Sequence, residues 1–320
     1  MIRTKLTTTM LAVAVVACAA GQAATTTPTQ PPATSAPTTA TEPTSPTTLP
    51  SSSTTTSQPQ FGSVLDVSVP SAALGHDQEV TIYTPAGYPD SGPLPVVYLL
   101  HGQQENNRMW LNLGLSDVAD QLIADGSIRP LLIVMPDIDN SFGVNNEESA
   151  LVEVPNGPLV HYDGNHYEDF LAVDLIDYID TNYETITDRA DRYVGGISMG
   201  GFAAIHLAFR HPGLFSRVGG HSPALIRDRD FTWLYPPDVA LDTRDPFLIA
   251  EKANLAGLAV YLDVGAQDEW GFLEPTEEMA RLLSDLGVDV RLEVRDGTHS
   301  FGYWRSNLPE YLSFYAHGNP

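Results

Sequence analysis

The sequence predicts an α/β domain with a mostly parallel central sheet that is flanked by helices. Continuous apolar runs such as "LPVVYLLHG" and "PLLIVMPD" are typical of parallel strands that are covered on both faces. Segments with helical spacing, such as "YEDFLAVDLIDYIDTNY", separate these runs along the chain. This alternation of strand and helix places the strands in one sheet and the helices on its two faces.

The domain begins near Phe61, and its first elements are expected at one edge of the sheet. "VLDVSVP" and "EVTIYTP" alternate apolar and polar residues, which predicts an antiparallel pair of strands. The two apolar runs follow as buried strands. The segment "LGLSDVADQLIADGS" between them has helical spacing and contains a glycine near its end.

The second half of the domain continues the alternation. "RYVGG" predicts a third buried strand, and "GFAAIHLAFRHPG" predicts a helix that Pro212 and Gly213 end. The strand "LAVYLDVG", the helix "EPTEEMARLLSDLG" and the strand "VDVRLEV" complete the pattern. Residues 140–166 and 220–245 follow neither period. Loops of this length in a compact domain are usually functional, so we expect them to shape a substrate pocket.

The first 23 residues have the pattern of a secretory signal peptide. Arg3 and Lys5 precede an apolar stretch over residues 10–20, which is too short to span a bilayer. Cys18, the only cysteine, ends the tetrapeptide "VVAC", which resembles a bacterial lipoprotein signal. We therefore expect lipidation at Cys18 and a protein anchored to the bacterial membrane at the cell surface. Cleavage within residues 21–23, which would release a secreted protein, is the alternative.

Residues 24–60 consist almost entirely of Thr, Pro, Ser and Ala. Such a segment buries too little apolar surface to offset the entropy of ordering, which predicts a disordered tether. The expected organisation is a signal peptide over residues 1–23, a linker over 24–60 and one domain over 61–320. Because the only cysteine precedes this domain, its stability must come from its core and not from a disulfide.

The charge of the chain limits its partners. Sixteen Lys and Arg residues face 40 Asp and Glu residues, for a net charge of −24. Nucleic acid and anionic membrane surfaces are therefore excluded as partners of the domain itself. We expect contact with a membrane only through the lipid anchor.

The motif Gly-x-Ser-x-Gly lies at residues 196–200, between the buried strand "RYVGG" and a helix. In this context a sharp strand-to-helix turn presents the serine hydroxyl above the sheet. Glycine at positions 196 and 200 lets the neighbouring backbone segments approach closely. We therefore predict that Ser198 is a nucleophile. A glycine-rich turn with an incidental serine is the alternative.

A serine nucleophile needs a histidine base that a carboxylate orients. In this architecture the order along the chain is serine, acid, histidine, and only His299 and His317 follow the last predicted strand. His299 is preferred because it comes directly after that strand.

The loop after "LAVYLDVG" supplies the acid. Asp268 is preferred because it lies beyond the end of the strand, where a carboxylate can reach a histidine. Glu269 and Asp263 are the alternatives, and Asp263 is expected to be a buried hydrogen-bonding residue inside the strand.

The tetrahedral intermediate that forms at a serine nucleophile also needs two amide donors for its oxyanion. The backbone amide of Met199, directly after the nucleophile, is the first. The second is expected from the loop after "VVYLLHG", where Gln103 is preferred and a shift of one residue in either direction stays open. His101 is interpreted as a structural hydrogen-bonding residue.

These motifs together resemble the bacterial putative-esterase family of α/β-hydrolases, which includes feruloyl esterases, enterochelin esterases, the esterase D type and mycolyltransferases. The resemblance runs from about Val64 to Leu312. It is carried by "SAALGHDQEVTIYTPAGY", "PVVYLLHG", "LIADGSIRPLLIVMPD", "YVGGISMGG", "LDVGAQDE" and "THSFGYWR". It implies the α/β-hydrolase fold, a triad of Ser198, Asp268 and His299, and an acyl-serine intermediate.

The expected function is a secreted serine esterase that acts on a small-molecule or polymer-linked ester without a cofactor. An acyltransferase of mycolyltransferase type and a surface lipoprotein that binds a ligand without catalysis are the alternatives. The cysteine-containing loop typical of formylglutathione hydrolases is absent after "LLHG", which argues against that activity.

Other residues carry weaker signals. "HYDGNHYED" places two histidines near three acids, but the expected chemistry already has its base and nucleophile, so a loop that lines the acyl or alcohol pocket is preferred over a catalytic metal site. "PDIDNSFGVNNEES" is rich in oxygen ligands for calcium but lacks a recognised ligand spacing, so no metal is predicted. Trp110 and Trp270 are possible contacts for an aromatic substrate. Trp304 is expected in the core or at its rim.

Overall fold

A computed structural model describes residues 61–153 and 159–316 of the chain. The predicted signal peptide with Cys18, the linker over residues 24–60, and His317 lie outside the described residues. Within these two ranges, no helix combines the length and the apolar character that crossing a membrane requires.

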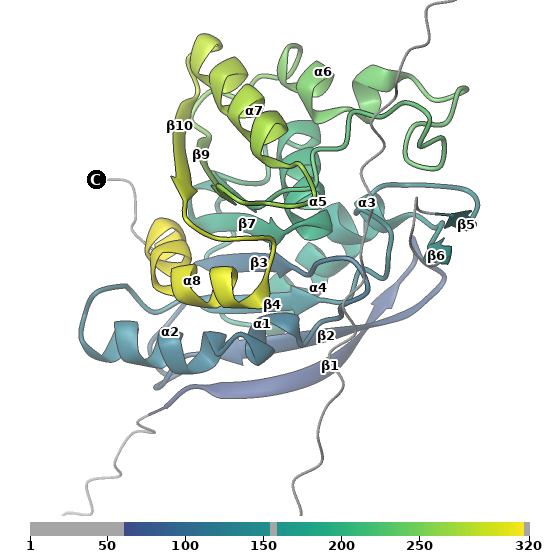
Figure 1. Ribbon diagram of the computed structural model, residues 1–320. Helices are drawn as coiled ribbons and strands as arrows, with labels where there is room; N and C mark the ends of the chain where they lie inside the picture. The colour runs from purple at the N-terminus through teal and green to yellow at the C-terminus, as the bar shows by residue number, and fades with distance from the viewer. Residues whose placement is uncertain (1–60, 154–158, 317–320) are drawn as a thin grey trace, which may run out of the picture.

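The described residues form one large sheet of eight strands in the order β1-β2-β4-β3-β7-β8-β9-β10 (Figure 1). The strands from β4 onward in this order are parallel, whereas β1 and β2 form the antiparallel edge that the sequence predicts. The strands are β1 (Ser63–Ser71), β2 (His76–Thr84), β3 (Val96–Leu100), β4 (Leu132–Pro136), β7 (Arg192–Ile197), β8 (Arg217–His221), β9 (Ala259–Gly265) and β10 (Asp289–Arg295).

A separate hairpin was not predicted. β5 (Ala150–Glu153) and β6 (Leu159–Tyr162) pair antiparallel beside the main sheet, within the segment that the sequence left irregular (Figure 1).

Helices cover both faces of the sheet. The helical elements are α1 (Met109–Asn112), α2 (Leu115–Ala124), α3 (Tyr167–Asp169), the π-helix η1 (Phe170–Asp174), α4 (Leu175–Asn182), the short 3₁₀ turns η2 (Arg189–Asp191) and η3 (Leu241–Thr243), α5 (Met199–Arg210), α6 (Pro246–Ala250), α7 (Leu273–Asp285) and α8 (Phe301–Ala316). One apolar core lies under α1, α2 and α8, and the other under α4 to α7.

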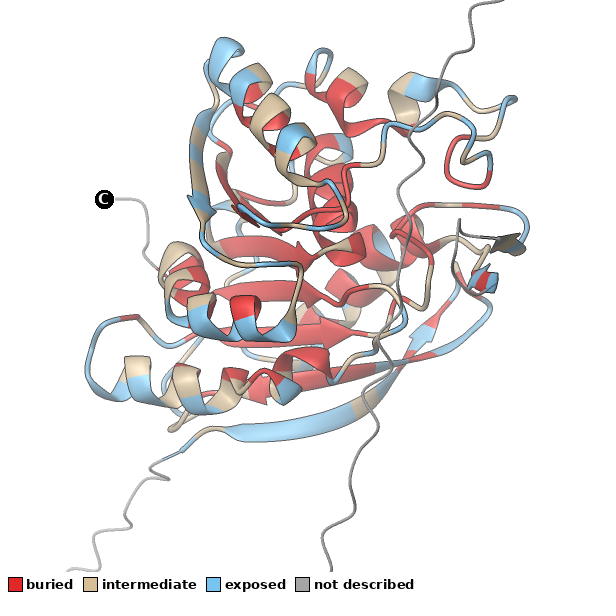
Figure 2. Cartoon of the chain, viewed as in Figure 1, coloured by how far each residue is buried: buried red, intermediate tan, exposed pale blue. Residues whose placement is uncertain are grey.

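The central strands explain the apolar runs in the sequence. In β3, alternate side chains enter different cores: Val96 and Tyr98 pack under α4 to α7, whereas Val97 and Leu99 pack under α1, α2 and α8. The central strands are buried along their whole length, whereas β1 at the edge is largely exposed (Figure 2). Because parallel strands share one carboxyl edge, the loops that follow β3, β4, β7, β9 and β10 meet there.

Candidate active site

Ser198 occupies the sharp turn between β7 and α5. Its φ of 54° and ψ of −115° are unusual for a residue with a side chain. The Ser198 amide donates to the carbonyl of His221 at 2.9 Å, and its carbonyl accepts from the amides of Phe202 at 3.0 Å and Ala224 at 2.9 Å. These three hydrogen bonds hold the serine backbone in its strained conformation.

The glycines of the motif are required by close backbone contacts. A Cβ atom at Gly196 would lie 2.2 Å from the carbonyl oxygen of Gly200. One at Gly200 would lie 2.4 Å from the carbonyl oxygen of Leu100, at the end of β3. The turn therefore packs directly on itself and on the neighbouring strand, as the sequence motif predicts.

The structure brings Ser198, His299 and Asp268 into one hydrogen-bonded chain. His299 Nε2 lies 2.9 Å from Ser198 Oγ, and His299 Nδ1 lies 2.8 Å from Asp268 Oδ2. A carboxylate only accepts, so Nδ1 carries the ring hydrogen and Nε2 is left to accept the serine proton. The side chains of Asp268 and His299 are 0% and 7% exposed, so water competes little for these bonds.

The two carboxylates that follow β9 have different partners. Asp268 also accepts from the amides of Trp270 and Phe272 through Oδ1, at 3.0 and 3.4 Å. Glu269 accepts from the backbone amide of His299 at 3.0 Å and makes no hydrogen bond to its imidazole. Asp268 is therefore the carboxylate that contacts the ring.

Asp263 is a buried hydrogen-bonding residue, as expected. The sequence did not reveal its partners, which form a buried network. Asp263 lies 2.7 Å from His221 Nδ1 and accepts from the Tyr311 hydroxyl at 2.8 Å, while His221 Nε2 lies 3.0 Å from the Tyr315 hydroxyl. Burial and the charge of Asp263 raise the pKa of Tyr311 well above its ordinary value, so its hydroxyl stays protonated as a donor. Because the carbonyl of His221 accepts from the Ser198 amide, this network supports the backbone of Ser198.

Two backbone amides near the Ser198 turn have no hydrogen-bond acceptor among the described residues. Met199 is the first residue of α5, and Gln103 lies in the loop after β3. Neither amide donates a hydrogen bond to another residue of the described ranges. Gly102 packs against Ser198, because a Cβ atom built on it would lie 3.7 Å from Ser198 Cβ.

Aromatic rings surround the imidazole. The ring centroids of Trp270, Phe272 and Trp304 lie 5.6, 5.3 and 4.9 Å from that of His299. Trp270 is partly exposed beside the imidazole, whereas Trp304 is buried, as expected, and donates from Nε1 to Ser222 Oγ at 3.2 Å.

The expectation that Trp110 contacts a substrate is wrong. Trp110 is 1% exposed and lies in the core under α1, α2 and α8. Its Nε1 donates to the carbonyl of Leu100 at 3.2 Å. The short helix α1 turns this side chain inward, which the position of the residue in the sequence does not reveal.

The two irregular segments pack on one another through aromatic rings. Tyr162 of β6 stacks on Trp233 with ring centroids 5.0 Å apart, and Phe142 and Phe231 contact both rings. The hydroxyl of Tyr162 accepts from Nε2 of Gln103 at 2.8 Å. These segments therefore reach the loop that borders Ser198.

The histidines of the 161–169 segment contact separate carboxylates. His161 lies 2.9 Å from Asp163, and His166 lies 3.4 Å from Asp169. No cluster of three or more His, Cys, Asp or Glu side chains in the described ranges is arranged to hold a metal ion.

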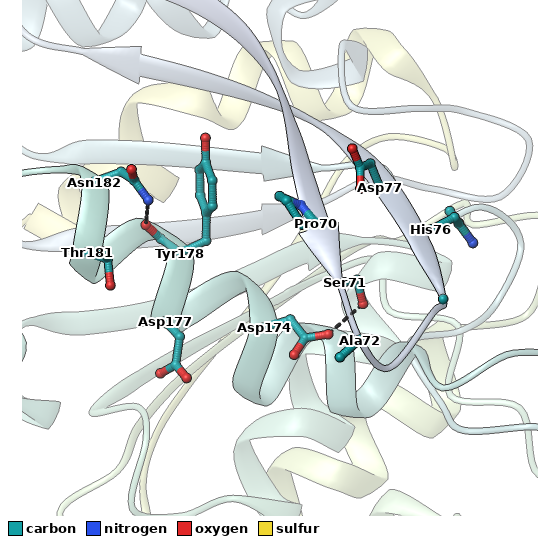
Figure 3. A pocket seen from close by; sticks show the side chains of 11 residues that line it. Pro70, Ser71, Ala72, His76, Asp77, Asp174, Asp177, Tyr178, Thr181 and Asn182 are labelled. Carbon is teal, nitrogen blue, oxygen red and sulfur yellow. Dashed lines mark hydrogen bonds between the residues drawn. The ribbon is translucent and has the colours of Figure 1, made fainter.

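A surface hollow lies elsewhere, between the turn that joins β1 to β2 and the helix α4 (Figure 3). Its lining includes Ser71, Asp77, Asp174 and Tyr178, and Asp174 accepts from the Ser71 hydroxyl at 2.6 Å. None of the residues that line it belongs to the hydrogen-bonded chain at Ser198, so it is separate from the candidate site.

Comparison with known proteins places the chain among esterases. A sequence profile described as "Putative esterase" matches residues 71–315. An endo-1,4-beta-xylanase/feruloyl esterase of Xylanibacter ruminicola is 31% identical over 164 residues, which are 49% of this chain and 21% of that protein. An esterase of Mycobacterium tuberculosis is 30% identical over 223 residues, which are 68% of this chain and 41% of that protein. The chain thus spans less than half the length of either curated relative.

Solved structures confirm the fold class. A ferulic acid esterase superposes with a TM-score of 0.67 at 26% identity, covering 81% of this chain and 99% of that one. An S-formylglutathione hydrolase of Agrobacterium tumefaciens superposes with a TM-score of 0.62 at 19% identity, covering 82% and 98%, which is a likeness of fold alone. Both the α/β-hydrolase fold and the resemblance stated from the sequence are therefore confirmed.

Proposed function

Because the chain belongs to the "Putative esterase" family, we propose that it is a serine esterase that hydrolyses a carboxylic ester through an acyl-serine intermediate. The observation that carries the proposal is the continuous hydrogen-bonded chain from Asp268 through His299 to Ser198. A nucleophile that lies next to a base, with the base oriented by a buried carboxylate, is the arrangement that activates a hydroxyl group.

In the first half of the reaction, Ser198 Oγ attacks the ester carbonyl carbon while its proton passes to His299 Nε2. The carbonyl oxygen becomes an oxyanion, to which the amides of Met199 and Gln103 donate. When the tetrahedral intermediate collapses, the carbon–oxygen bond to the alcohol breaks. The alcohol leaves with the proton from His299, and the acyl group stays on Ser198.

In the second half, water attacks the acyl carbon and gives a proton to His299 Nε2. The bond to Ser198 Oγ then breaks, and His299 returns the proton to the serine as the carboxylic acid leaves. Asp268 keeps the hydrogen on Nδ1 throughout, and it stabilises the imidazolium that forms in each half.

The proposal extends to place and substrate. The signal-like start, Cys18 and the Thr/Pro/Ser-rich segment support a secreted protein, held at the cell surface by a lipid anchor. The substrate is a small-molecule or polymer-linked ester. The feruloyl esterase activity in the name of one relative, together with the partly exposed ring of Trp270, supports an aromatic acyl group.

Hydrolysis of p-nitrophenyl esters and of a hydroxycinnamate methyl ester tests the proposal. We expect turnover by the wild type, its loss in Ser198→Ala, and full activity in the control Ser127→Ala, which alters an exposed serine after α2. A fluorophosphonate should label the wild type at Ser198. A wild type that neither turns over any ester nor reacts with the fluorophosphonate would favour the non-catalytic binding protein, and acyl transfer to added glycerol or sugar in preference to water would favour the acyltransferase.

A further inference from the structure

His101 is a buried imidazole at the end of β3 for which the proposed mechanism has no use. It is 1% exposed and makes no hydrogen bond to Ser198, Asp268 or His299. We propose that His101 is a positioning residue, which aims the backbone amide of Gln103 at the oxyanion. This inference rests on the esterase function proposed above.

One hydrogen bond joins the imidazole to the peptide group beside it. His101 Nδ1 lies 2.8 Å from the carbonyl oxygen of Gly102. A carbonyl oxygen only accepts, so Nδ1 carries a hydrogen and donates it, whatever the protonation state of the ring. The peptide group that joins Gly102 to Gln103 is therefore tied to the imidazole by its carbonyl side.

Because the peptide group is planar and trans, the hydrogen bond to its carbonyl also fixes the direction of its N–H. Its C=O and N–H bonds point to opposite sides. With the Gly102 carbonyl held toward the imidazole, the Gln103 N–H points away from it. Gly102 itself packs against Ser198, with a built Cβ atom 3.7 Å from the serine Cβ, so this amide lies in the loop that borders the nucleophile.

The neighbouring amides single out Gln103 as the donor. The Gly102 amide is directed at the sulfur of Met109, 3.1 Å away, and the Gln104 amide donates to Oδ1 of Asn140 at 2.7 Å. The Gln103 amide between them has no partner in the described ranges. The sequence left a shift of one residue open, and these contacts leave only the middle amide for a substrate.

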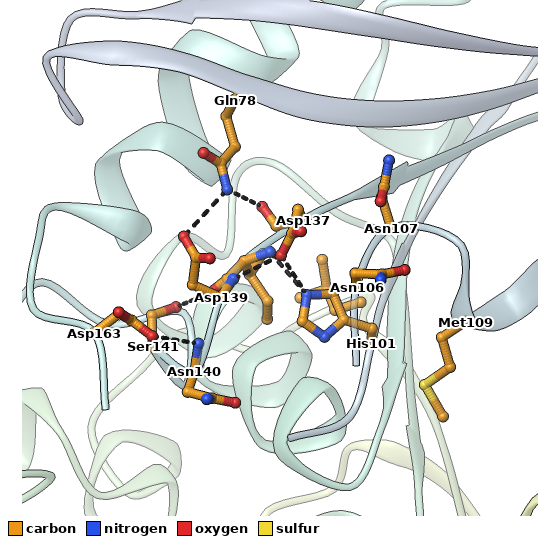
Figure 4. Close-up of polar contacts among 12 residues, drawn as sticks. Gln78, His101, Asn106, Asn107, Met109, Asp137, Asp139, Asn140, Ser141 and Asp163 are labelled. Carbon is orange, nitrogen blue, oxygen red and sulfur yellow. Dashed lines mark hydrogen bonds and ion pairs between the residues drawn. The ribbon is translucent and has the colours of Figure 1, made fainter. Parts of the chain in front are cut away.

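The other side of the imidazole is held by the loop after β4 (Figure 4). His101 Nε2 lies 3.0 Å from Oδ1 of Asp137 and 2.9 Å from the amide nitrogen of Ile138. Asp137 is fixed in turn, because Oδ1 accepts from the Asp139 amide at 2.9 Å. Gln78 on β2 donates to the Asp137 carbonyl at 3.0 Å.

These contacts argue against two simpler roles for His101, that of a second general base and that of a side chain that only fills the core. A second general base needs a ring nitrogen that is open to the substrate, but both nitrogens of His101 are occupied by protein groups. Replacing a side chain that only fills the core would lower the stability of the fold, but it would not weaken stabilisation of the oxyanion more than binding of the ground-state ester. A positioning role predicts a selective loss in the transition state.

Two variants of similar polarity test the inference. In His101→Asn, the side-chain amide nitrogen takes the place of Nδ1 and can donate to the Gly102 carbonyl. In His101→Gln, the amide nitrogen takes the place of Nε2, so the Gly102 carbonyl loses its imidazole donor and keeps only the longer hydrogen bond from the Glu105 amide, at 3.2 Å. Removing an oxyanion donor altogether costs about 10²–10³-fold in kcat, so we expect misdirecting one to cost about 10–100-fold.

Steady-state kinetics with a p-nitrophenyl ester provides the readout, and the thermal midpoint of each variant is measured in parallel. We expect His101→Gln to lower kcat with KM nearly unchanged, and His101→Asn to recover most of kcat at the same thermal midpoint. Inhibition by phenylboronic acid, whose serine adduct places an oxygen at the oxyanion position, should weaken in parallel with kcat. Equal losses in both variants, unchanged kcat in His101→Gln, or a loss in KM alone would overturn the inference.

A measurement on the wild type covers the case in which neither variant folds. With ¹³C-carbonyl glycine and ¹⁵N-glutamine labels, NMR selects the amides of Gln22 and Gln103, the two glutamines that follow a glycine, and a Gln22→Ala background leaves only the amide that joins Gly102 to Gln103. It should shift downfield when phenylboronic acid binds, and an unmoved resonance would refute its role as a donor. A wild type without turnover would instead refute the proposed esterase, so the two failures are distinguishable.

Discussion

Replacing Asp268 by Asn should exchange donor and acceptor in the hydrogen bond to His299 Nδ1 without changing the shape of the side chain. In the wild type, Oδ1 accepts from the amides of Trp270 and Phe272, and Oδ2 faces His299 Nδ1 at 2.8 Å. The two backbone donors force the asparagine oxygen to take the place of Oδ1, because the flipped amide would set NH₂ against two N–H groups. The asparagine NH₂ therefore faces Nδ1.

An NH₂ group only donates, so Nδ1 must become an acceptor and the ring hydrogen moves to Nε2. In that tautomer, Nε2 no longer accepts the proton of Ser198. The same exchange in a serine protease triad lowers kcat by about 10⁴-fold, which corresponds to about 5.4 kcal/mol. We expect a loss of this size in Asp268→Asn, measured as kcat for a p-nitrophenyl ester near pH 7.

The adjacent Glu269 supplies the matched control. It accepts from the His299 backbone amide at 3.0 Å and makes no hydrogen bond to the ring, and glutamine keeps an acceptor oxygen there. We therefore expect Glu269→Gln to retain kcat within about threefold, far from the 10⁴-fold loss of a wrong tautomer. Asp268→Asn activity within tenfold of the wild type, or equal losses in the two variants, would refute the assignment of the acid.

Three further predictions concern the turn, the pocket and a buried charge. Gly200→Ala places a Cβ atom 2.4 Å from a backbone oxygen, so urea unfolding should show a loss of about 1–3 kcal/mol; an unchanged midpoint would contradict the packing. Trp270→Ala should raise KM for a hydroxycinnamate ester more than for an acetate ester, whereas the buried Trp110→Phe should lower stability without changing that preference; equal KM effects on both esters would count against Trp270. Burial opposes ionisation of Glu168, but hydrogen bonds from His206 and His211 prevail and hold its pKa well below 4.5. Its folded pKa is thus below the unfolded one, so the stability lost in Glu168→Gln should be largest near pH 7 and shrink as pH falls below about 4.5; a difference independent of pH would contradict this.

The sequence predicts those parts of the fold that depend on local pattern. The continuous apolar runs of β3, β4 and β7 reflect burial on both faces. The glycine at position 196 reflects a backbone contact within the turn, and the glycine at position 200 reflects a contact of the turn with the end of β3. Ser198, Asp268 and His299 could be proposed because the carboxyl edge of a parallel sheet gathers the loops that follow successive strands.

Features that depend on tertiary packing escaped prediction. Helix α8 contains Pro309 and lacks a clear apolar stripe, so neither the helix nor the network of its Tyr311 and Tyr315 with Asp263 could be derived. The β5–β6 hairpin is short and needs the aromatic rings of the 220–245 segment as its partner. Trp110 was misplaced because position in the sequence does not give the direction of a side chain.

The central claim is that Ser198 carries the acyl group during turnover. Rapid acid quenching of the wild type during hydrolysis of a p-nitrophenyl ester, followed by intact-mass and peptide mass spectrometry, tests it directly. We expect a protein whose mass is increased by one acyl group, with the modification mapped to the peptide that contains Ser198. Release of p-nitrophenol with an acyl group on another residue, while Ser198 stays unmodified, would contradict it.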